Sequence, residues 1–273
     1  MPYPLNTPLG RFGIETSEEG PERCVASIPS SGRNPLTGLA TVAPLAMLVD
    51  HVGGLINHLR RGPQEWTVSS ELCLEVDDHA VEIIAGSPDL DVVAVSRPLG
   101  RKGVTALGMC ELSVGRDLIA TATVRSFYID APAGIGAWPD GPAGSLPGTT
   151  LGELMAVQPG EAGGTTAVLM QRGDPVLNNI VGTVHGGVSS MGLELVGSAA
   201  LNSGSDQHQD GDTNQPYRTG SLRVNFLRPF HGGAQAHYRA TPVRIGRRSG
   251  VAEMQAVGGD GSVALLARLT AYR

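Results

Sequence analysis

The sequence is short of aromatic residues, of cysteine and of positive charge. Phe, Trp and Tyr together make up 4% of the 273 residues, whereas there are 38 glycines. Small residues, rather than large rings, must therefore provide much of the close packing. The formal net charge of −6 argues against a general nucleic-acid binder, which would carry a basic surface.

The three cysteines, Cys24, Cys73 and Cys110, lack metal-ligand spacing. We interpret them as core or surface thiols, and their odd number suits a reducing compartment. The sequence begins without a basic region followed by an apolar core, so it predicts no signal peptide. No apolar run reaches the length of a membrane span. We therefore expect a soluble, cytoplasmic protein without a membrane span.

The chain contains two similar halves. The first-half residues Asn34, Gly38, Thr41 and Asp50 recur 144 positions later as Asn178, Gly182, His185 and Glu194. Thr67-Val-Ser is matched by Thr219-Gly-Ser, 152 positions later, and both tyrosines near the strand ends, Tyr128 and Tyr272, return to the spacing of 144. An ordered series of this kind indicates an internal duplication. A Pro/Gly-rich linker at 130–149 separates the halves.

Each half is predicted to contain short strands, one long helix and then further strands. Pro44 fits the first turn of a helix over 44–59, and a second helix is expected to begin near Gly186. The expected strands are 11–15, 23–28, 66–75, 80–85, 92–97, 104–113, 118–129, 218–227, 234–245, 251–257 and 262–272. An antiparallel sheet wrapped around a buried helix is an α+β arrangement.

The most informative stretch is His185-Gly186-Gly187, followed by a run of small and apolar residues that contains one acid, Glu194. Two glycines before a helix let another group approach the backbone closely. The start of a helix also offers unpaired N–H groups and a partial positive charge, which suit an oxyanion.

This pattern, Asn179-x-x-Gly182-x-x-His185-Gly186-Gly187 with an acid nine residues after the histidine, resembles the hotdog-fold acyl-CoA thioesterases of the phenylacetyl-CoA thioesterase-like group. The segment 219–229 resembles the strand that follows the helix in that family. The resemblance implies a double hotdog, with two antiparallel sheets each wrapped around a long central helix. Residues 1–129 would be an N-terminal hotdog with a degenerate motif, and residues 150–273 a C-terminal hotdog with the intact motif.

The spacing within one helix predicts that the site crosses between the halves. His185 and Glu194 are nine residues apart, which is roughly 13 Å along a helix axis. One thioester cannot contact both, because catalytic contacts are about 3 Å long. The donor end of one helix must therefore meet an acid from the other, and two antiparallel helices supply this geometry.

Two composite sites follow. The first has the complete set: Asn179, His185, Gly186, Asp50 and Thr67. The second is degenerate, because Thr41-Val-Ala43 replaces the His-Gly-Gly motif, and it consists of Asn34, Thr41, Val42, Glu194 and Thr219. We expect the first to be the working site.

The expected reaction is hydrolysis of an acyl-CoA thioester to the free acid and CoA. The Gly186 N–H would hold the developing negative charge, and Asp50 would act as general base or as nucleophile. Thr67 could hold the water by its hydroxyl, while the resemblance implies that Asn179 and His185 orient the substrate or the water. No metal or other cofactor is expected.

Coenzyme A carries phosphates, which favour arginine and lysine. The candidates stand in two matching loops and are Arg101, Lys102, Arg247 and Arg248, with Arg60 and Arg61 as further possibilities. The alternative interpretation of these loops is that they are solvated hairpin tips.

Structural interpretations compete with each of these roles. His185-Gly-Gly could be a simple helix-start turn, and Asp50 could be a buried acid paired with His51 or His58. Glu194 could be a structural relic, and Thr67 and Thr219 ordinary strand residues. His231-Gly-Gly imitates the motif, but it precedes a strand and is interpreted as a turn.

Two other functions stay open. One is a double hotdog that binds acyl-CoA without turnover, and the other is an enoyl-CoA hydratase or dehydratase of the same fold. The identity of the acyl group cannot be read from the sequence. Exposed sheet edges are commonly covered by assembly, so a homo-oligomer is expected.

Overall fold

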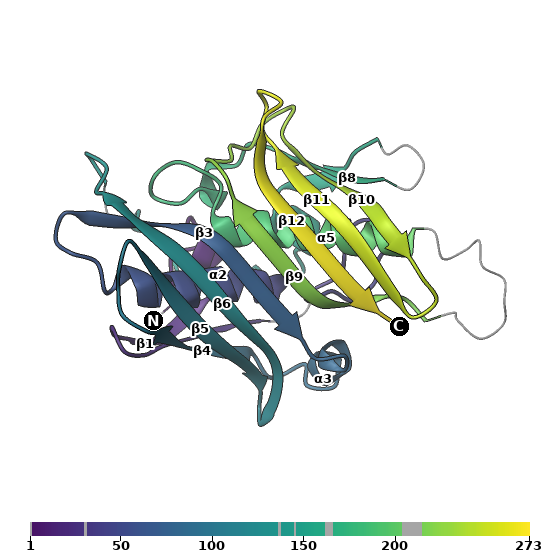
Figure 1. Cartoon of the computed structure of the whole chain (residues 1–273), viewed down its shortest axis with the longest axis horizontal. Coiled ribbons are helices and arrows are strands. Elements are labelled where there is room, and N and C mark those ends of the chain that lie inside the picture. Colours follow the sequence, from purple (N-terminus) through teal and green to yellow (C-terminus); the bar gives the residue numbers. More distant parts are fainter. Residues whose placement is uncertain (1, 30–31, 136–137, 145, 162–165, 204–214) are drawn as a thin grey trace.

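The strands of both halves form a single antiparallel sheet (Figure 1). The computed structural model describes residues 2–29, 32–135, 138–144, 146–161, 166–203 and 215–273. In the described residues the sheet has 12 strands in the order β1-β2-β4-β5-β6-β3-β9-β12-β11-β10-β8-β7. The prediction of two separate sheets is therefore wrong, because β3 (Glu65–Val76) pairs directly with β9 (Arg218–Phe226).

The first half of the sheet consists of six strands. They are β1 (Glu15–Glu19), β2 (Cys24–Ile28), β4 (Val92–Leu99), β5 (Thr105–Val114), β6 (Asp117–Asp130) and β3. The second half consists of β9, β12 (Val263–Tyr272), β11 (Ser249–Val257), β10 (His237–Ile245), β8 (Ala167–Gln171) and β7 (Val157–Pro159). Buried and less buried residues alternate along β2 and β5, as expected for strands with one face on the core.

Two long helices lie on one face of the sheet, α2 (Ala43–His58) behind the first half and α5 (Gly186–Asn202) behind the second (Figure 1). α2 contacts β2 to β6, and α5 contacts β8 to β12. Most residues of both helices are buried. The two helices also contact each other, so that the core is continuous between the halves.

The remaining elements are short. They are α1 (Pro8–Arg11), α3 (Ala80–Ala85), α4 (Leu151–Leu154) and the 3-10 helix η1 (Pro175–Leu177). The segment Ala80–Ala85 was predicted as a strand and is a helix, and the strand predicted at 11–15 begins only at Glu15. Asp77 explains the first error: its carboxylate accepts from the His79 N–H (2.9 Å) and its carbonyl from the Ala80 N–H (3.0 Å), which starts a helical turn.

Within the described residues, no helix combines the length and the apolar character that crossing a membrane would require. The other predicted strands and both long helices are confirmed within a few residues at their ends. The division into 1–129, 130–149 and 150–273 stays a prediction.

Candidate active site

The Asp50 carboxylate lies in the middle of α2 and faces the start of α5. The residue is 7% exposed. Ser69 on β3 donates its hydroxyl proton to Asp50 Oδ1 over 3.0 Å. The other oxygen, Oδ2, lies 3.4 Å from His185 Nδ1. A carboxylate from the first half therefore meets the start of the helix in the second half.

The histidine at the start of α5 is its N-cap. His185 Nδ1 accepts a hydrogen bond from the Gly187 N–H at 3.1 Å. Burial lowers the pKa of His185, and the nearby Asp50 opposes that shift. The ring is therefore neutral with its proton on Nε2, and the contact between Nδ1 and Asp50 Oδ2 is not an ion pair.

Two groups at this crossing are left without a partner. Among the described residues, none accepts from the Gly186 N–H, the first amide of α5. Asp50 Oδ2 likewise receives no proton from any residue that the structure describes. The helix-start amide without an acceptor thus belongs to Gly186, the residue that packs against the Asp50 carboxylate.

The two glycines of the motif serve different purposes. A Cβ on Gly186 would lie 2.7 Å from Asp50 Oδ2 and 3.1 Å from a ring carbon of Phe226. A Cβ on Gly187 would lie 2.8 Å from the Met47 Cα. The absence of a side chain at Gly186 therefore leaves room for the Asp50 carboxylate, and its absence at Gly187 lets α5 approach the backbone of α2.

Three sequence-based pairings around Asp50 differ from the structure. Thr67 does not contact Asp50: its hydroxyl lies 2.8 Å from His58 Nδ1. His51 points elsewhere and has its Nε2 2.9 Å from the Thr16 hydroxyl. Burial, aided by the neighbouring His185, lowers the pKa of His51 to about 3, and burial lowers that of His58 to about 4. Neither histidine is the partner of Asp50.

Asn179 lies in the loop that leads to His185 and stabilises that loop. Its Oδ1 accepts from the N–H groups of Val181 and Thr183, both at 3.1 Å, and its Nδ2 donates to the Thr183 hydroxyl at 3.0 Å. These side-chain contacts are all local, within four residues of Asn179. Asn34 has the same turn-forming role in the first half, because its Oδ1 accepts from the Leu36 N–H.

The second crossing joins Glu194 of α5 to the start of α2. The hydroxyls of Thr41 and Thr219 donate to its two carboxylate oxygens, at 2.7 Å and 2.6 Å. Thr41 also accepts from the Ala43 N–H, and Asn34 Nδ2 donates to the Leu195 carbonyl. Burial raises the pKa of Glu194, against the effect of the two hydroxyls. Val42 stands where the other crossing has Gly186.

The proposed CoA-binding cations lie in the two turns that were predicted. Arg101 is exposed in the β4–β5 turn, and Arg247 and Arg248 are exposed in the β10–β11 turn. Lys102 forms an ion pair with Glu65 and lies with its ammonium 4.2 Å from the Tyr128 ring centroid. Their role in binding phosphate stays a prediction.

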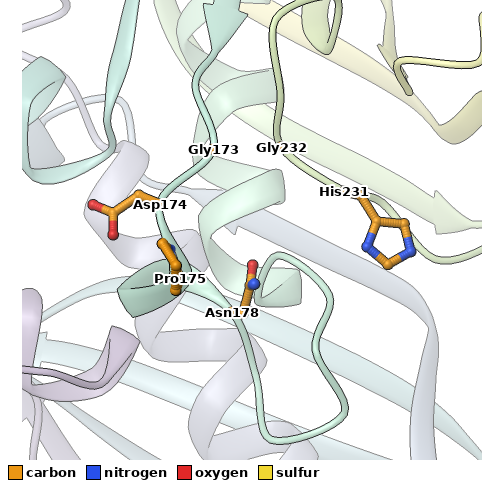
Figure 2. A pocket seen from close by; sticks show the side chains of 6 residues that line it. All are labelled: Gly173, Asp174, Pro175, Asn178, His231 and Gly232. Carbon is orange, nitrogen blue, oxygen red and sulfur yellow. The ribbon is translucent and has the colours of Figure 1, made fainter.

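Two adjoining surface hollows lie beside the loop that leads to α5. Gly173, Asp174, Pro175, Asn178, His231 and Gly232 line the first (Figure 2). Asn6, Trp138, Pro139, Pro175, Asn178, Asn179 and Ile180 line the second. Neither lining includes Asp50 or Gly186. Asp174 is also paired with Arg11 at 3.2 Å, so its carboxylate is already in use.

Ser69, whose hydroxyl bonds Asp50, is a side chain at the first crossing that the sequence did not indicate. It lies two residues beyond Thr67, on the same strand; the alignment of Thr67-Val-Ser with Thr219-Gly-Ser selected Thr67, whereas in the structure Ser69 bonds Asp50 and Thr67 contacts His58. In the structure Ser69 and Thr219 hold matching places, since each donates to the acid of the helix in its own half. Ser69 is the third residue of the Thr67-Val-Ser tripeptide. Residues two apart on a strand share a face, so the sequence already offered Ser69 as a second candidate.

Comparison with known proteins agrees with this architecture. Residues 181–265 match the model of the thioesterase superfamily, so this part of the second half is similar to that superfamily. A search of curated proteins found no match to the sequence of this chain.

Several solved structures share the fold over almost the whole chain. Acyl-CoA thioesterase II TesB2 from Mycobacterium marinum is 11% identical, with a TM-score of 0.58 and 97% of each chain covered. A putative thioesterase from Novosphingobium aromaticivorans is 11% identical, with a TM-score of 0.59 over 94% of this chain and 97% of that one. A protein of unknown function with a hot dog fold from Alicyclobacillus acidocaldarius is 13% identical, with a TM-score of 0.57 over 94% and 95%. The chain therefore has the hotdog fold.

Proposed function

We propose that the protein is an acyl-CoA thioesterase with one working site, at the crossing where Asp50 meets the start of α5. The observation that carries the proposal is the close packing of Gly186 against Asp50 Oδ2. A Cβ at Gly186 would lie 2.7 Å from Asp50 Oδ2, and the amide of Gly186 has no acceptor among the residues described. The match of residues 181–265 to the thioesterase-superfamily model supports this reaction class.

The Gly186 N–H has the position to bind the thioester oxygen. The carbonyl oxygen becomes negatively charged when a nucleophile adds, and an amide at a helix start stabilises that charge. One such donor contributes roughly 3 kcal/mol to the transition state in known acyl-transfer sites. The capping of Gly187 by His185 leaves the preceding amide as the available donor.

Asp50 supplies the base or the nucleophile through Oδ2. As a base it takes a proton from water, the resulting hydroxide adds to the carbonyl carbon, the C–S bond breaks and the thiolate regains a proton. As a nucleophile it adds to the carbonyl carbon, the C–S bond breaks and the CoA thiolate leaves and takes up a proton. Water then hydrolyses the mixed anhydride, which releases the acid and restores the Asp50 carboxylate. In either case the Ser69 hydroxyl holds Oδ1, so that Oδ2 faces the substrate.

The remaining predicted residues have supporting roles in this proposal. His185 and Asn179 shape the start of α5 and its approach loop, whereas Arg101, Lys102, Arg247 and Arg248 are candidates for the CoA phosphates. The crossing at Glu194 is structural, because both carboxylate oxygens are occupied by hydroxyls.

The proposal is tested by incubating the full chain with a panel of acyl-CoAs and following the release of free thiol. The wild type is expected to release thiol, and Asp50→Asn is expected to lose this activity while it keeps its thermal midpoint. Saturable binding of acyl-CoA by the wild type without thiol release would instead identify a binding protein.

A further inference from the structure

One face of α2 carries Asp50, Gly54 and His58, spaced four residues apart, so that they form a row along the helix. Both ends of the row are held to β3: Ser69 binds Asp50, and Thr67 lies 2.8 Å from His58. Gly54 stands between them and is half-buried, yet a Cβ added there would meet no atom within 4 Å. We define the open space beside Gly54, between Asp50 and His58, as the Gly54 slot.

Packing does not require the glycine at this position. The preceding Gly53 is required, because its Cβ would lie 2.7 Å from Val124 and 3.2 Å from the Cys110 sulfur. Gly54 has no such neighbour, and glycine inside a helix is unfavourable compared with alanine. The absence of a side chain at Gly54 therefore keeps a space open rather than letting two elements approach.

The second half repeats the packing glycine but not the open one. Gly197 occupies the place of Gly53, and its Cβ would lie 2.9 Å from the Met254 sulfur. The next residue is Ser198, in the place of Gly54. The slot is thus specific to the half that supplies Asp50.

Positively charged and aromatic side chains gather at the far end of the slot. Arg61 lies 5.8 Å from the ring centroid of Trp66, which itself packs against the His58 ring. Arg60 donates to the Gly100 carbonyl over 3.0 Å, which holds the β4–β5 turn against this end. That turn also carries Arg101 and Lys102. In a protein with a net charge of −6, such a gathering of cations is distinctive.

We propose that the Gly54 slot receives the pantetheine arm of the acyl-CoA, and that Gly54 is a specificity-determining position. This inference rests on the proposed thioesterase function. Eight residues separate Asp50 from His58, roughly 12 Å along the helix, which is a distance that an extended pantetheine arm covers. Thr67 and His58 Nδ1 contact each other, which leaves His58 Nε2 as a hydrogen-bond partner for an amide of the arm, and the cations beyond meet the phosphates.

The experiment compares Gly54→Met and Gly54→Ala with Ser198→Met, the matched change in the other half. Binding of free CoA is measured by calorimetry, and KM is measured for acetyl-, hexanoyl- and lauroyl-CoA. Gly54→Met is expected to weaken CoA binding at least tenfold and to raise KM by a similar factor for all three substrates. Gly54→Ala should show a smaller effect, and Ser198→Met none. The thermal midpoints of all variants are measured alongside, to show that each is folded.

Two results overturn the assignment. Unchanged CoA binding in a folded Gly54→Met means that the arm does not occupy the slot. A KM increase confined to lauroyl-CoA, with CoA binding intact, means that the slot takes the acyl chain instead.

The CoA titration also separates the slot from the proposed reaction. If the wild type releases no thiol from any substrate, the proposed function fails, and CoA binding that is lost in Gly54→Met still supports the slot. If the wild type binds no CoA, the slot assignment fails as well.

Discussion

The two helix crossings have the same plan but leave their carboxylates in opposite states. At the first, Asp50 receives one hydroxyl, from Ser69, and its second oxygen is free of described donors. At the second, Glu194 receives two hydroxyls and is 1% exposed. An acid with an unused lone pair can accept a proton or attack a carbonyl, whereas a fully bonded one holds two helices together.

A single glycine accounts for much of this difference. Gly186 leaves the space beside Asp50 empty, whereas Val42, 2% exposed, stands at the matching position of the second crossing. The capping group differs too, since Thr41 can donate to Glu194 while it accepts from the Ala43 N–H. A neutral His185 cannot do both through one nitrogen.

The largest expected difference comes from removing each acid in turn. Asp50→Asn should lower thiol release roughly 10³-fold, because it removes the base or nucleophile, while Glu194→Gln should leave the rate essentially unchanged. Initial rates with one acyl-CoA at saturation measure both. Loss of activity in Glu194→Gln with a normal thermal midpoint would show that the second crossing is the working one.

The next effect comes from exchanging the small residues at the helix starts. Gly186→Ala should lower kcat about 10²-fold, since its Cβ displaces the Asp50 carboxylate and a shift of about 1 Å has this effect on catalysis. Val42→Ala, the matched change, should leave kcat unaltered and lower the free energy of unfolding by about 2 kcal/mol through lost burial. Denaturant titration checks the stability. If Gly186→Ala were fully active, the close packing of Gly186 against Asp50 would not matter for catalysis.

A smaller effect distinguishes the two hydroxyls of β3. Ser69→Ala should lower kcat about tenfold, because a hydrogen bond to a charged group contributes about 1.5 to 3 kcal/mol, while Thr67→Ala should affect kcat little. Steady-state kinetics of both variants measure this. The reverse order would restore the assignment of Thr67 that the sequence predicted.

The smallest effect concerns stability at acid pH. Neutral His51 has a pKa of about 3, below its ordinary value of 6.5. The stability that this neutral form contributes is therefore complete above pH 6.5 and is lost as the pH falls towards 3.

The second half has Leu195 in the place of His51. The wild type and His51→Leu should therefore differ in how much unfolding free energy they lose between pH 7 and pH 5. The loss in His51→Leu should be smaller by about 2 kcal/mol. Urea titrations at the two pH values test this. Equal losses in variant and wild type would mean that His51 is not buried in its neutral form.

The sequence predicted the two long helices, most strands and the meeting of Asp50 with Gly186, because these depend on periodicity and on the length of a helix. It did not predict the choice of Ser69 over Thr67. Thr67 and Ser69 are two residues apart on β3, so both face α2, where Thr67 contacts His58 and Ser69 bonds Asp50. Which of the two hydroxyls reaches Asp50 depends on how α2 lies along β3, and no local sequence pattern specifies this. Pairing of β3 with β9 was also missed, since strand order between halves leaves no local pattern.

The duplicated helix crossing has a consequence for how such a protein can change. In an assembly of two identical chains, every substitution appears at both crossings together. Here the strand pair β3–β9 joins halves encoded separately on one chain, so a substitution alters one crossing alone. Covalent fusion thereby lets one crossing specialise in holding the molecule together, while the other keeps a carboxylate oxygen that receives no described hydroxyl.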